Sequence, residues 1–279
     1  MPSVTGLEHL TLLGVAPPDL VTVAAAAGFD AVGLRISPAT DDERPWPMTP
    51  GSAMLAETAL RCADTGITVL DAEAVRLGPG RLGPGRLGPG RLGPGRAEVT
   101  PVLDAAAQLG ARYVNAICED PDLARLSDEF AWLVAEARPY GIRPVIEFMA
   151  YRSVRTLADA TAIAARSGGG GILIDALHVQ RCGVGLDALR ALDPGLVTYV
   201  QLCDAPLTAP ADQVGEARSA RLLPGDGELP ITGLLAALPG GVPVTVEAPQ
   251  AGSADHPAAF AARARRALES VLIQSKERP

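Results

Sequence analysis

Four oxygen-bearing side chains each close an apolar run in the second half of the sequence. Glu147 follows VI, Asp175 follows ILI, Gln201 follows YV and Glu247 follows VTV. If these runs are parallel strands of a barrel, their carboxyl ends meet at one mouth and all four side chains can point into the same space. Three carboxylates brought that close repel one another and have raised pKa values unless a cation lies among them.

A divalent metal ion would resolve this repulsion. Ligands that offer only oxygen, three of them anionic, suit a hard or borderline ion. We therefore predict one divalent ion. Mn²⁺ is the first choice, and Mg²⁺, Co²⁺ and Zn²⁺ are the alternatives. Taken singly, each residue has an ordinary alternative, because a carboxylate at a strand end is often only a helix cap or a solvated loop contact. Their occurrence on four successive strands is the stronger signal.

The elements that must position these residues alternate along the chain. Short β-rich runs alternate with Ala-rich amphipathic stretches, which is typical of βα units around a parallel sheet. Strands are predicted at Leu7–Leu13, Ala31–Ile36, Ile67–Ala74, Tyr113–Cys118, Arg143–Phe148, Gly171–Asp175, Val197–Leu202 and Val242–Glu247. Helices are predicted at Pro17–Ala27, Ser52–Thr65, Ala97–Leu109, Pro121–Tyr140, Thr156–Ser167, Leu186–Leu192, Ile231–Leu238 and His256–Gln274.

Glycines mark several junctions between a predicted helix and the next strand. They are Gly28, Gly66, Gly110, Gly141 and Gly168, where a left-handed C-terminal cap is expected. The pattern predicts the α/β class and a single (β/α)₈ TIM barrel domain over residues 1–279. A doubly wound sheet would show the same local pattern.

One segment breaks this alternation. Residues 76–96 hold four tandem copies of RLGPG and a final arginine. Glycine and proline at that density favour neither a helix nor a central strand, so a flexible insertion is predicted. It is either a slipped-repeat expansion of the gene or a basic lid whose five arginines meet an anionic substrate.

Composition excludes several classes of function. The chain has 279 residues and a net charge of −8, and a basic face for phosphate is therefore not expected, which argues against nucleic acid as a partner. No stretch approaches the roughly 20 apolar residues that span a bilayer, and the N-terminus lacks a signal-like pattern. We expect a cytoplasmic protein without a membrane partner. The four cysteines lie far apart, which predicts reduced thiols.

The sequence also resembles a known family. The runs VIEFMAYRSVRTLADA, ILIDALHVQRCG, YVQLCDAP, RLLPGDGELPITGLLAALP and VPVTVEAPQ look like the xylose isomerase-like TIM-barrel superfamily of sugar phosphate isomerases and epimerases. The likeness covers nearly the whole chain. Members bind a divalent metal through Glu, Asp, His and Glu at the ends of strands five to eight, which match Glu147, Asp175, Gln201 and Glu247. Gln201 replaces the histidine, as in the 3-dehydroshikimate dehydratase branch.

This resemblance implies a divalent-metal-dependent isomerase or epimerase of a small polyhydroxylated carbonyl compound. A base would remove a proton next to a metal-polarised carbonyl and form an enediolate. The candidate catalytic groups are His178, Glu147 and Glu247. His178 follows Asp175 by three residues and is expected in the loop after strand six, where a surface histidine is the ordinary alternative.

Three further residues are candidates for binding the substrate. Arg35 and Glu73 end the second and third predicted strands, and Arg221 precedes a PGDGE turn that family members place over the site. They are expected to hold a carboxylate, phosphate or hydroxyl group, with ion pairing among themselves as the alternative. His9 is expected to be buried and hydrogen-bonded, and His256 to lie on the surface.

Other functions stay open at this point. The nearest is a metal-dependent lyase, either a dehydratase of the dehydroshikimate type or an enzyme that eliminates an aglycone from an oxidised sugar. DNA repair of the endonuclease IV kind needs a histidine-rich three-metal cluster, and this chain has 3 histidines and an acidic balance. A non-catalytic barrel would use the repeat-bearing loop to dock another subunit. The expected partner is a small-molecule substrate, and family barrels often pair as homodimers.

Overall fold

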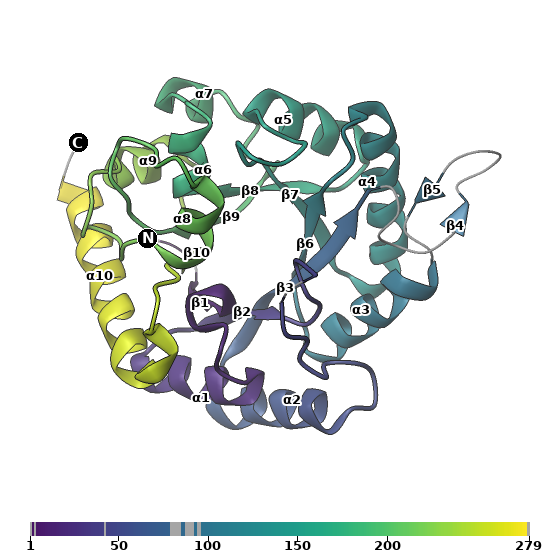
Figure 1. Ribbon diagram of the computed structural model, residues 1–279, viewed down its shortest axis with the longest axis horizontal. Coiled ribbons are helices and arrows are strands. Elements are labelled where there is room, and N and C mark those ends of the chain that lie inside the picture. The colour runs from purple at the N-terminus through teal and green to yellow at the C-terminus, as the bar shows by residue number, and fades with distance from the viewer. Residues whose placement is uncertain are drawn as a thin grey trace.

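The architecture is a closed barrel of parallel strands (Figure 1). The computed structural model describes residue 2 and residues 4–41, 43–78, 85–86, 92–93 and 96–277. Within these ranges, eight strands pair in the cyclic order β1-β10-β9-β8-β7-β6-β3-β2. They are β1 (Thr5–Glu8), β2 (Ala31–Arg35), β3 (Thr68–Leu77), β6 (Tyr113–Cys118), β7 (Arg143–Glu147), β8 (Gly171–Asp175), β9 (Val197–Leu202) and β10 (Val244–Val246). The predicted TIM barrel is confirmed.

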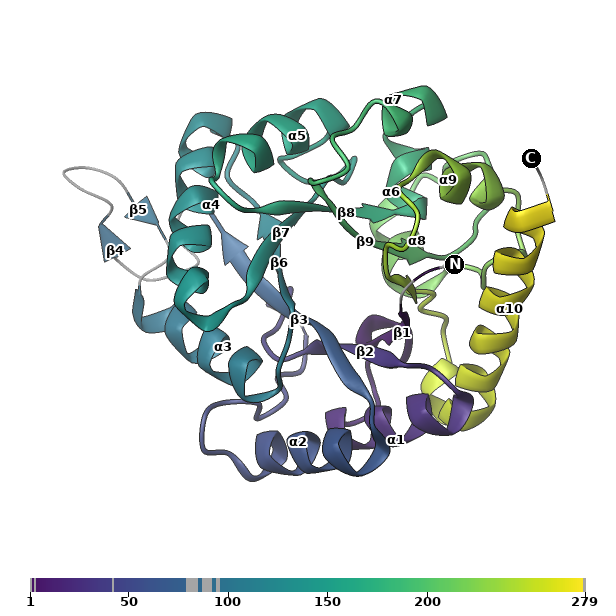
Figure 2. The same cartoon turned by 180° about the vertical axis from the view of Figure 1, so that it is seen from behind.

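Helices surround the barrel, as the view from behind also shows (Figure 2). They are α1 (Pro17–Ala27), α2 (Ala53–Thr65), α3 (Arg96–Gln108), α4 (Leu123–Ala137), α5 (Leu157–Arg166), α6 (Ala176–Arg181), α7 (Leu186–Arg190), α8 (Gln213–Ser219), α9 (Ile231–Ala237) and α10 (Pro257–Glu277). The last helix packs beside both α1 and α9, so the end of the chain covers the strands that close the barrel.

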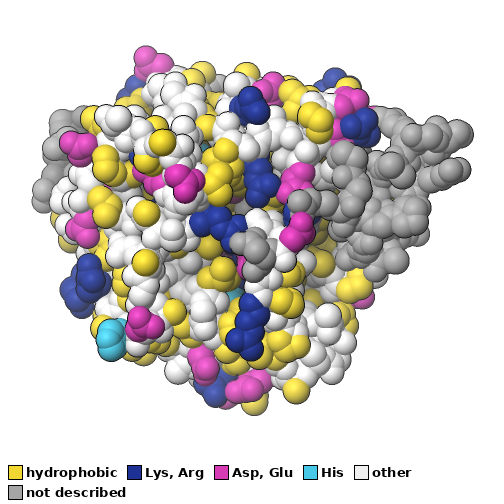
Figure 3. Space-filling view, viewed as in Figure 1, with side chains coloured by type: hydrophobic (Ala, Val, Ile, Leu, Met, Phe, Trp, Pro, Cys, Tyr) yellow, Lys and Arg dark blue, Asp and Glu magenta, His cyan; other side chains and the backbone are white. Residues whose placement is uncertain are grey.

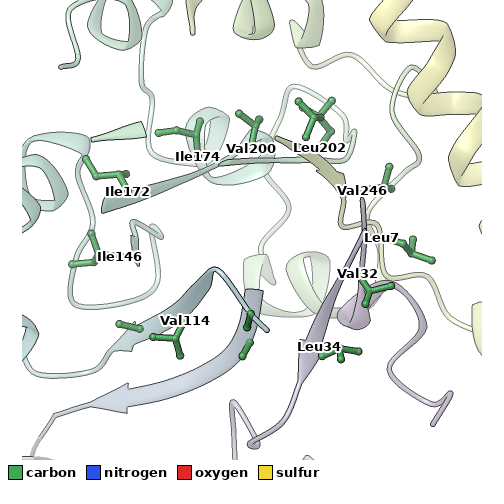
Figure 4. Close-up of a cluster of buried hydrophobic side chains, with 14 of the residues drawn as sticks. Leu7, Val32, Leu34, Val114, Ile146, Ile172, Ile174, Val200, Leu202 and Val246 are labelled. Atoms are coloured by element: carbon green, nitrogen blue, oxygen red, sulfur yellow. The ribbon is translucent and has the colours of Figure 1, made fainter. Parts of the chain in front are cut away.

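Apolar side chains fill two separate layers. Alternate strand residues join one large cluster with the helices, and Figure 4 shows members of it around the barrel, among them Ile146 and Ile174. A smaller cluster contains Val145, Leu173 and Tyr199 from three adjacent strands. Side chains alternate between the two faces of a strand. The residues two positions after this inner cluster therefore also face inward, one level nearer the carboxyl end, and these are Glu147, Asp175 and Gln201.

The five glycines predicted to end helices do adopt left-handed conformations. Their φ angles lie between 69° and 86°, a region that side chains with a Cβ rarely occupy. Gly28, for example, caps α1 by donating its amide to the carbonyls of Ala24 and Ala25. These junctions turn each helix back towards the next strand and so fix where the strand begins.

Several elements differ from the sequence-based expectation; for example, β3 continues to Leu77 beyond the predicted Ala74, and β10 is shorter than the predicted Val242–Glu247. The first strand ends at Glu8, and His9–Leu12 form a 3-10 helix instead of continuing the strand to Leu13. The helices α6 and α8 were not predicted, although α7 and α9, which are just as short, were. His178 consequently lies in a helix and not in a loop.

The predicted insertion at 76–96 is described only in part. Arg76 and Leu77 belong to β3, and Arg96 begins α3. Residues 85–86 and 92–93 form the short antiparallel strands β4 (Gly85–Arg86) and β5 (Leu92–Gly93). The rest of the insertion, 79–84, 87–91 and 94–95, lies outside the described residues.

Among the described residues, no helix is both long and apolar enough to cross a membrane.

Candidate metal centre

A cavity of about 230 Å³ opens at the carboxyl ends of the strands. Glu147, His178, Arg221 and Glu247 line it, together with Asn115. Arginine side chains lie near the middle of the face that Figure 1 presents, next to acidic ones (Figure 3). The mouth of the barrel is therefore a polar cavity with charges of both signs.

Arg221 lies between two of the predicted metal ligands. Its Nη1 is 2.6 Å from Oδ2 of Asp175, and its Nη2 is 3.0 Å from Oε2 of Glu247. Its Nε donates to the carbonyl of Ala217 in α8, which orients the guanidinium. All three ionic side chains are at most 5% exposed. Arg221 thus supplies a buried positive charge that joins Asp175 to Glu247.

Glu147 faces His178 on the other side of Asp175. Its Oε1 is 3.6 Å from Nε2 of His178, and its Oε2 accepts a 3.5 Å hydrogen bond from Nδ2 of Asn115. Glu147, Asp175 and His178 can each place one ligand atom within 4.8 Å of the others. Tyr151 approaches the imidazole edge-on, with ring centroids 5.6 Å apart.

Asp175 has two structural roles. One oxygen pairs with Arg221, and Oδ1 accepts the backbone amide of His178 at 3.1 Å, which makes Asp175 the N-cap of α6. This capping bond fixes the first turn of α6 and places His178 at the cavity. Asp175 is therefore both a helix cap, as the ordinary alternative expected, and a member of the cluster with Glu147 and His178.

Gln201 pairs in register with Asp175 on one side and with Thr245 on the other. Its side chain is 1% exposed, and neither its Oε1 nor its Nε2 has a hydrogen-bond partner. A buried amide without partners costs free energy. Gln201 therefore offers an unused oxygen donor on the strand next to Asp175.

The carboxyl groups of the site have shifted pKa values. Burial, followed by repulsion from Asp175 and Glu247, raises the pKa of Glu147 well above its usual range. Burial also raises the pKa of Glu247 to about 8, with repulsion from Glu73 adding to the effect. Asp175 shifts the other way: burial opposes its ionisation, but the charge of Arg221 outweighs this and lowers its pKa. Burial lowers the pKa of His178 to about 4, so its imidazole is neutral at pH 7.

These residues fit a divalent cation. Arg221 is the only cation that pairs directly with Glu147, Asp175 or Glu247 among the Lys and Arg side chains of the described residues, so ionising all three carboxyl groups requires further positive charge, in keeping with the raised pKa values of Glu147 and Glu247. Oε1 of Glu147 and both amide atoms of Gln201 are buried without partners. Oxygen donors of this kind, with a neutral imidazole nearby, suit Mn²⁺, Mg²⁺ or Zn²⁺.

The other predicted substrate-binding residues form ion pairs with one another. Nη2 of Arg35 is 3.2 Å from Oε2 of Glu73, and its Nε is 3.3 Å from Oε1 of Glu43. Both Arg35 and Glu73 still line the cavity. His9 is buried as expected: its Nε2 contacts the carbonyl of Val15 at 2.9 Å, and its Nδ1 accepts the amide of Arg35 at 3.1 Å.

Several polar residues inside the barrel were not predicted from the sequence. Asn115 interrupts the apolar run YVNAIC, and Asp71 precedes Glu73 by two residues, which places both carboxylates on one face of a strand. These interruptions of apolar runs are visible in the sequence and could have indicated the interior residues. Glu8 was harder to find, because the first strand was expected to continue beyond it. These residues belong to the barrel interior and are considered further below.

Comparisons with known proteins agree with the architecture. The model of the family "Xylose isomerase-like TIM barrel" matches residues 21–271. No curated protein matches the sequence significantly. Among solved structures, a xylose isomerase-like TIM barrel/4-hydroxyphenylpyruvate dioxygenase fusion protein is similar, with 24% identity and a TM-score of 0.79. That alignment covers 100% of this chain and 44% of the fusion protein, so this chain spans less than half of its length.

Two other structures are similar over nearly their whole length. The IolI protein with a bound zinc atom has 17% identity and a TM-score of 0.73, covering 98% of this chain and 97% of that one. D-psicose 3-epimerase in the presence of D-fructose has 18% identity and a TM-score of 0.70, covering 95% and 97%. Likeness at this identity supports the fold alone. With the family model matched over most of its length, the chain belongs to the xylose isomerase-like TIM barrel family.

Proposed function

We propose that this protein is a divalent-metal-dependent isomerase or epimerase of a small polyhydroxylated carbonyl compound. The observation that carries the proposal is the convergence of Glu147, Asp175 and His178 within 4.8 Å, next to the cavity that Glu147, His178, Arg221 and Glu247 line at the barrel mouth. Glu147, Asp175, Gln201 and Glu247 would hold the ion, and Mn²⁺ is the ion we propose. Bound there, it would supply positive charge that polarises a substrate carbonyl.

The residues of the chain account for the proton transfers. Glu147 ends β7 and Glu247 follows β10, and in the barrel these strands are separated by β8 and β9. The two carboxyl groups therefore face a bound substrate from different sides. One takes a proton from the carbon next to the carbonyl, and the other returns a proton to the same carbon or its neighbour. Arg35, Glu73 and Arg221 orient the substrate through its oxygen atoms.

A lyase is the second candidate, and His178 is the observation that favours it. This histidine is 1% exposed and neutral at pH 7, and its Nδ1 has no hydrogen-bond partner. It can accept a proton from carbon while a β-hydroxyl leaves with a proton as water. The use of Gln201 in place of histidine as a metal ligand, with histidine three residues after Asp175, is similar to 3-dehydroshikimate dehydratases. Elimination of an aglycone from an oxidised sugar would use the same base.

Incubation in deuterated water distinguishes the two reactions. The metal-stripped protein is reloaded with Mn²⁺ and incubated with keto-sugars and with β-hydroxy carbonyl compounds. An isomerase incorporates deuterium without losing water, whereas a lyase produces a conjugated absorbance. Glu147→Gln is expected to lower the rate of either reaction by about 100-fold or more. Glu57→Gln, on the exposed side of α2, is the matched control and should keep the rate.

A result in which no substrate reacts, or in which Glu147→Gln reacts as fast as wild type, would overturn the proposal. We further propose that residues 1–279 act as one barrel domain and that two chains pair as a homodimer. Mass measurement in solution tests this pairing, and a single-chain mass at working concentrations would contradict it.

A further inference from the structure

A second group of carboxylates lies inside the barrel, apart from the proposed metal ligands. Glu8 ends β1, and Asp71 and Glu73 belong to β3. Each can place one carboxylate oxygen within 4.8 Å of the others. Glu8 and Asp71 are 0% exposed and Glu73 is 2% exposed. Glu73 also lines the cavity, so this interior cluster, defined as Glu8, Asp71 and Glu73, begins at the cavity and extends away from it.

Gly33 in β2 makes room for this cluster. It pairs in register with Glu8 on one side and with Asp71 on the other. A Cβ at this position would lie 1.7 Å from Oε2 of Glu8 and 2.5 Å from Oδ1 of Asp71. Any other residue would therefore collide with both carboxyl groups. The glycine leaves a space in which two acidic oxygens approach each other.

The oxygens in this space lack hydrogen bonds of good geometry. The carboxyl oxygens of Glu8 and Asp71 approach each other and also the side chains of Thr245 and Tyr199, but no well-formed hydrogen bond satisfies them or the hydroxyl of Tyr199, which comes from β9 and is 0% exposed. Burial raises the pKa of Asp71 well above its usual range, and the hydroxyl of Tyr199 opposes this rise by approaching the Asp71 carboxyl group. Tyr199 thus points a fully buried hydroxyl oxygen from another strand towards the interior cluster.

Positive charge is scarce around these oxygens. The guanidinium of Arg35 reaches Glu73 and Glu43. Within the described ranges, no Lys, Arg or His nitrogen forms an ion pair with Glu8 or Asp71. Burial and mutual repulsion raise the pKa values of both acids well above their usual range. Buried carboxylates without a counter-charge are costly, and a cation among them removes the cost.

We propose that Glu8, Asp71 and Glu73, together with the hydroxyl of Tyr199, form a second cation site inside the barrel. All four donors are oxygens, so the site suits a hard divalent ion such as Mn²⁺ or Ca²⁺. Glu73 gives the ion a route from the cavity. An ion held there links β1, β3 and β9 across the barrel. It also offsets the negative charge of Glu73, which otherwise repels Glu247.

Counting bound ions tests the proposal. Metal-free protein is titrated with Mn²⁺, and bound ions are counted by native mass spectrometry and by elemental analysis. Wild type and the control Glu57→Gln should bind two ions per chain. Glu147→Gln and Asp71→Asn should each bind one, and the double variant none. A wild-type protein that binds one ion, lost in Glu147→Gln and kept in Asp71→Asn, would overturn the second site and leave the proposed catalytic ion intact.

The reverse result separates the two proposals. If the single ion is lost in Asp71→Asn and kept in Glu147→Gln, the interior site stands and the proposed catalytic ion fails. Because Asp71→Asn could unfold the barrel, Tyr199→Phe serves as a second variant that removes only one oxygen.

In a Glu147→Gln background, Tb³⁺ serves as a luminescent probe for hard-cation sites that is excited through a nearby tyrosine. Its emission should be strong and should fall several-fold in Tyr199→Phe. Emission that is absent, or equal in both proteins, contradicts the interior site.

Discussion

The strand-end site and the interior cluster face the same electrostatic difficulty but differ in how the chain meets it. At the strand ends, Arg221 bridges Asp175 and Glu247, so part of the negative charge is neutralised by the protein itself. In the interior, Glu8 and Asp71 have no such partner among the described residues, and Gly33 provides only space. The guanidinium of Arg221 lowers the pKa of Asp175 but does not offset the burial of Glu247, whose pKa is raised to about 8, whereas Glu8 and Asp71 depend wholly on protons or on an added ion.

Removing the positive charge of Arg221 should have the largest effect on stability. Arg221→Met leaves Asp175 and Glu247 buried without their counter-charge, so the free energy of unfolding of the metal-free protein should fall by about 3–5 kcal/mol. Urea denaturation measures this. Saturating Mn²⁺ should restore part of the loss. The control Arg61→Met breaks an exposed pair on α2 and should cost less than about 1 kcal/mol. Equal losses of unfolding free energy in both variants would mean that the Arg221 bridge stabilises the protein no more than an exposed ion pair.

Filling the interior space should have the next largest effect. In Gly33→Ala the new methyl group meets Oε2 of Glu8, and overpacking of this kind costs about 1–3 kcal/mol. Adding Glu8→Ala removes the obstructing carboxyl group, so the double variant should be destabilised by less than the sum of the two single changes. Gly185→Ala, where nothing lies within 4 Å of an added Cβ, is the control and should be close to neutral. Additive losses would contradict the steric argument.

The smallest effect is a change in the pH dependence of stability. The folded pKa values of Glu8 and Asp71 lie above the unfolded values of about 4. The folded state therefore binds more protons, and its stability is full below pH 4 and falls as the pH rises, by at most about 1.4 kcal/mol per pH unit for each retained proton. Metal-free Glu8→Gln should show a flatter decline than wild type in thermal unfolding measured from pH 4 upwards. An unchanged slope would mean that the carboxyl pair is not the source.

Sequence patterns predicted the barrel well because its signals are local. Helix α1 has the predicted bounds, and Gly28 and Gly66 end helices in the expected conformation. The strand-end residues were found for the same reason, since a polar residue closing an apolar run needs no knowledge of distant contacts. Their use as metal ligands remains a prediction.

Arrangements that depend on long-range contacts could not be predicted. The sequence placed Arg221 near the site, but its position between Asp175 and Glu247 depends on contacts with two strands and with Ala217 of α8, a helix that was not predicted. The interior cluster depends on the pairing of β1, β2 and β3, which brings Glu8 and Asp71 to the two sides of Gly33. The spacing of residues along the chain does not predict this contact between Glu8 and Asp71.

The capping bond of α6 explains the spacing between Asp175 and His178. A capping side chain reaches the amide of the third helical residue, so the acid and the histidine that follows three positions later are placed by one turn of backbone. The capping bond sets their backbone spacing within the heptapeptide Asp175–Arg181, while Arg221 and Tyr151 contact the two side chains from elsewhere in the chain. Such a backbone unit could be transferred between barrels whose substrates differ.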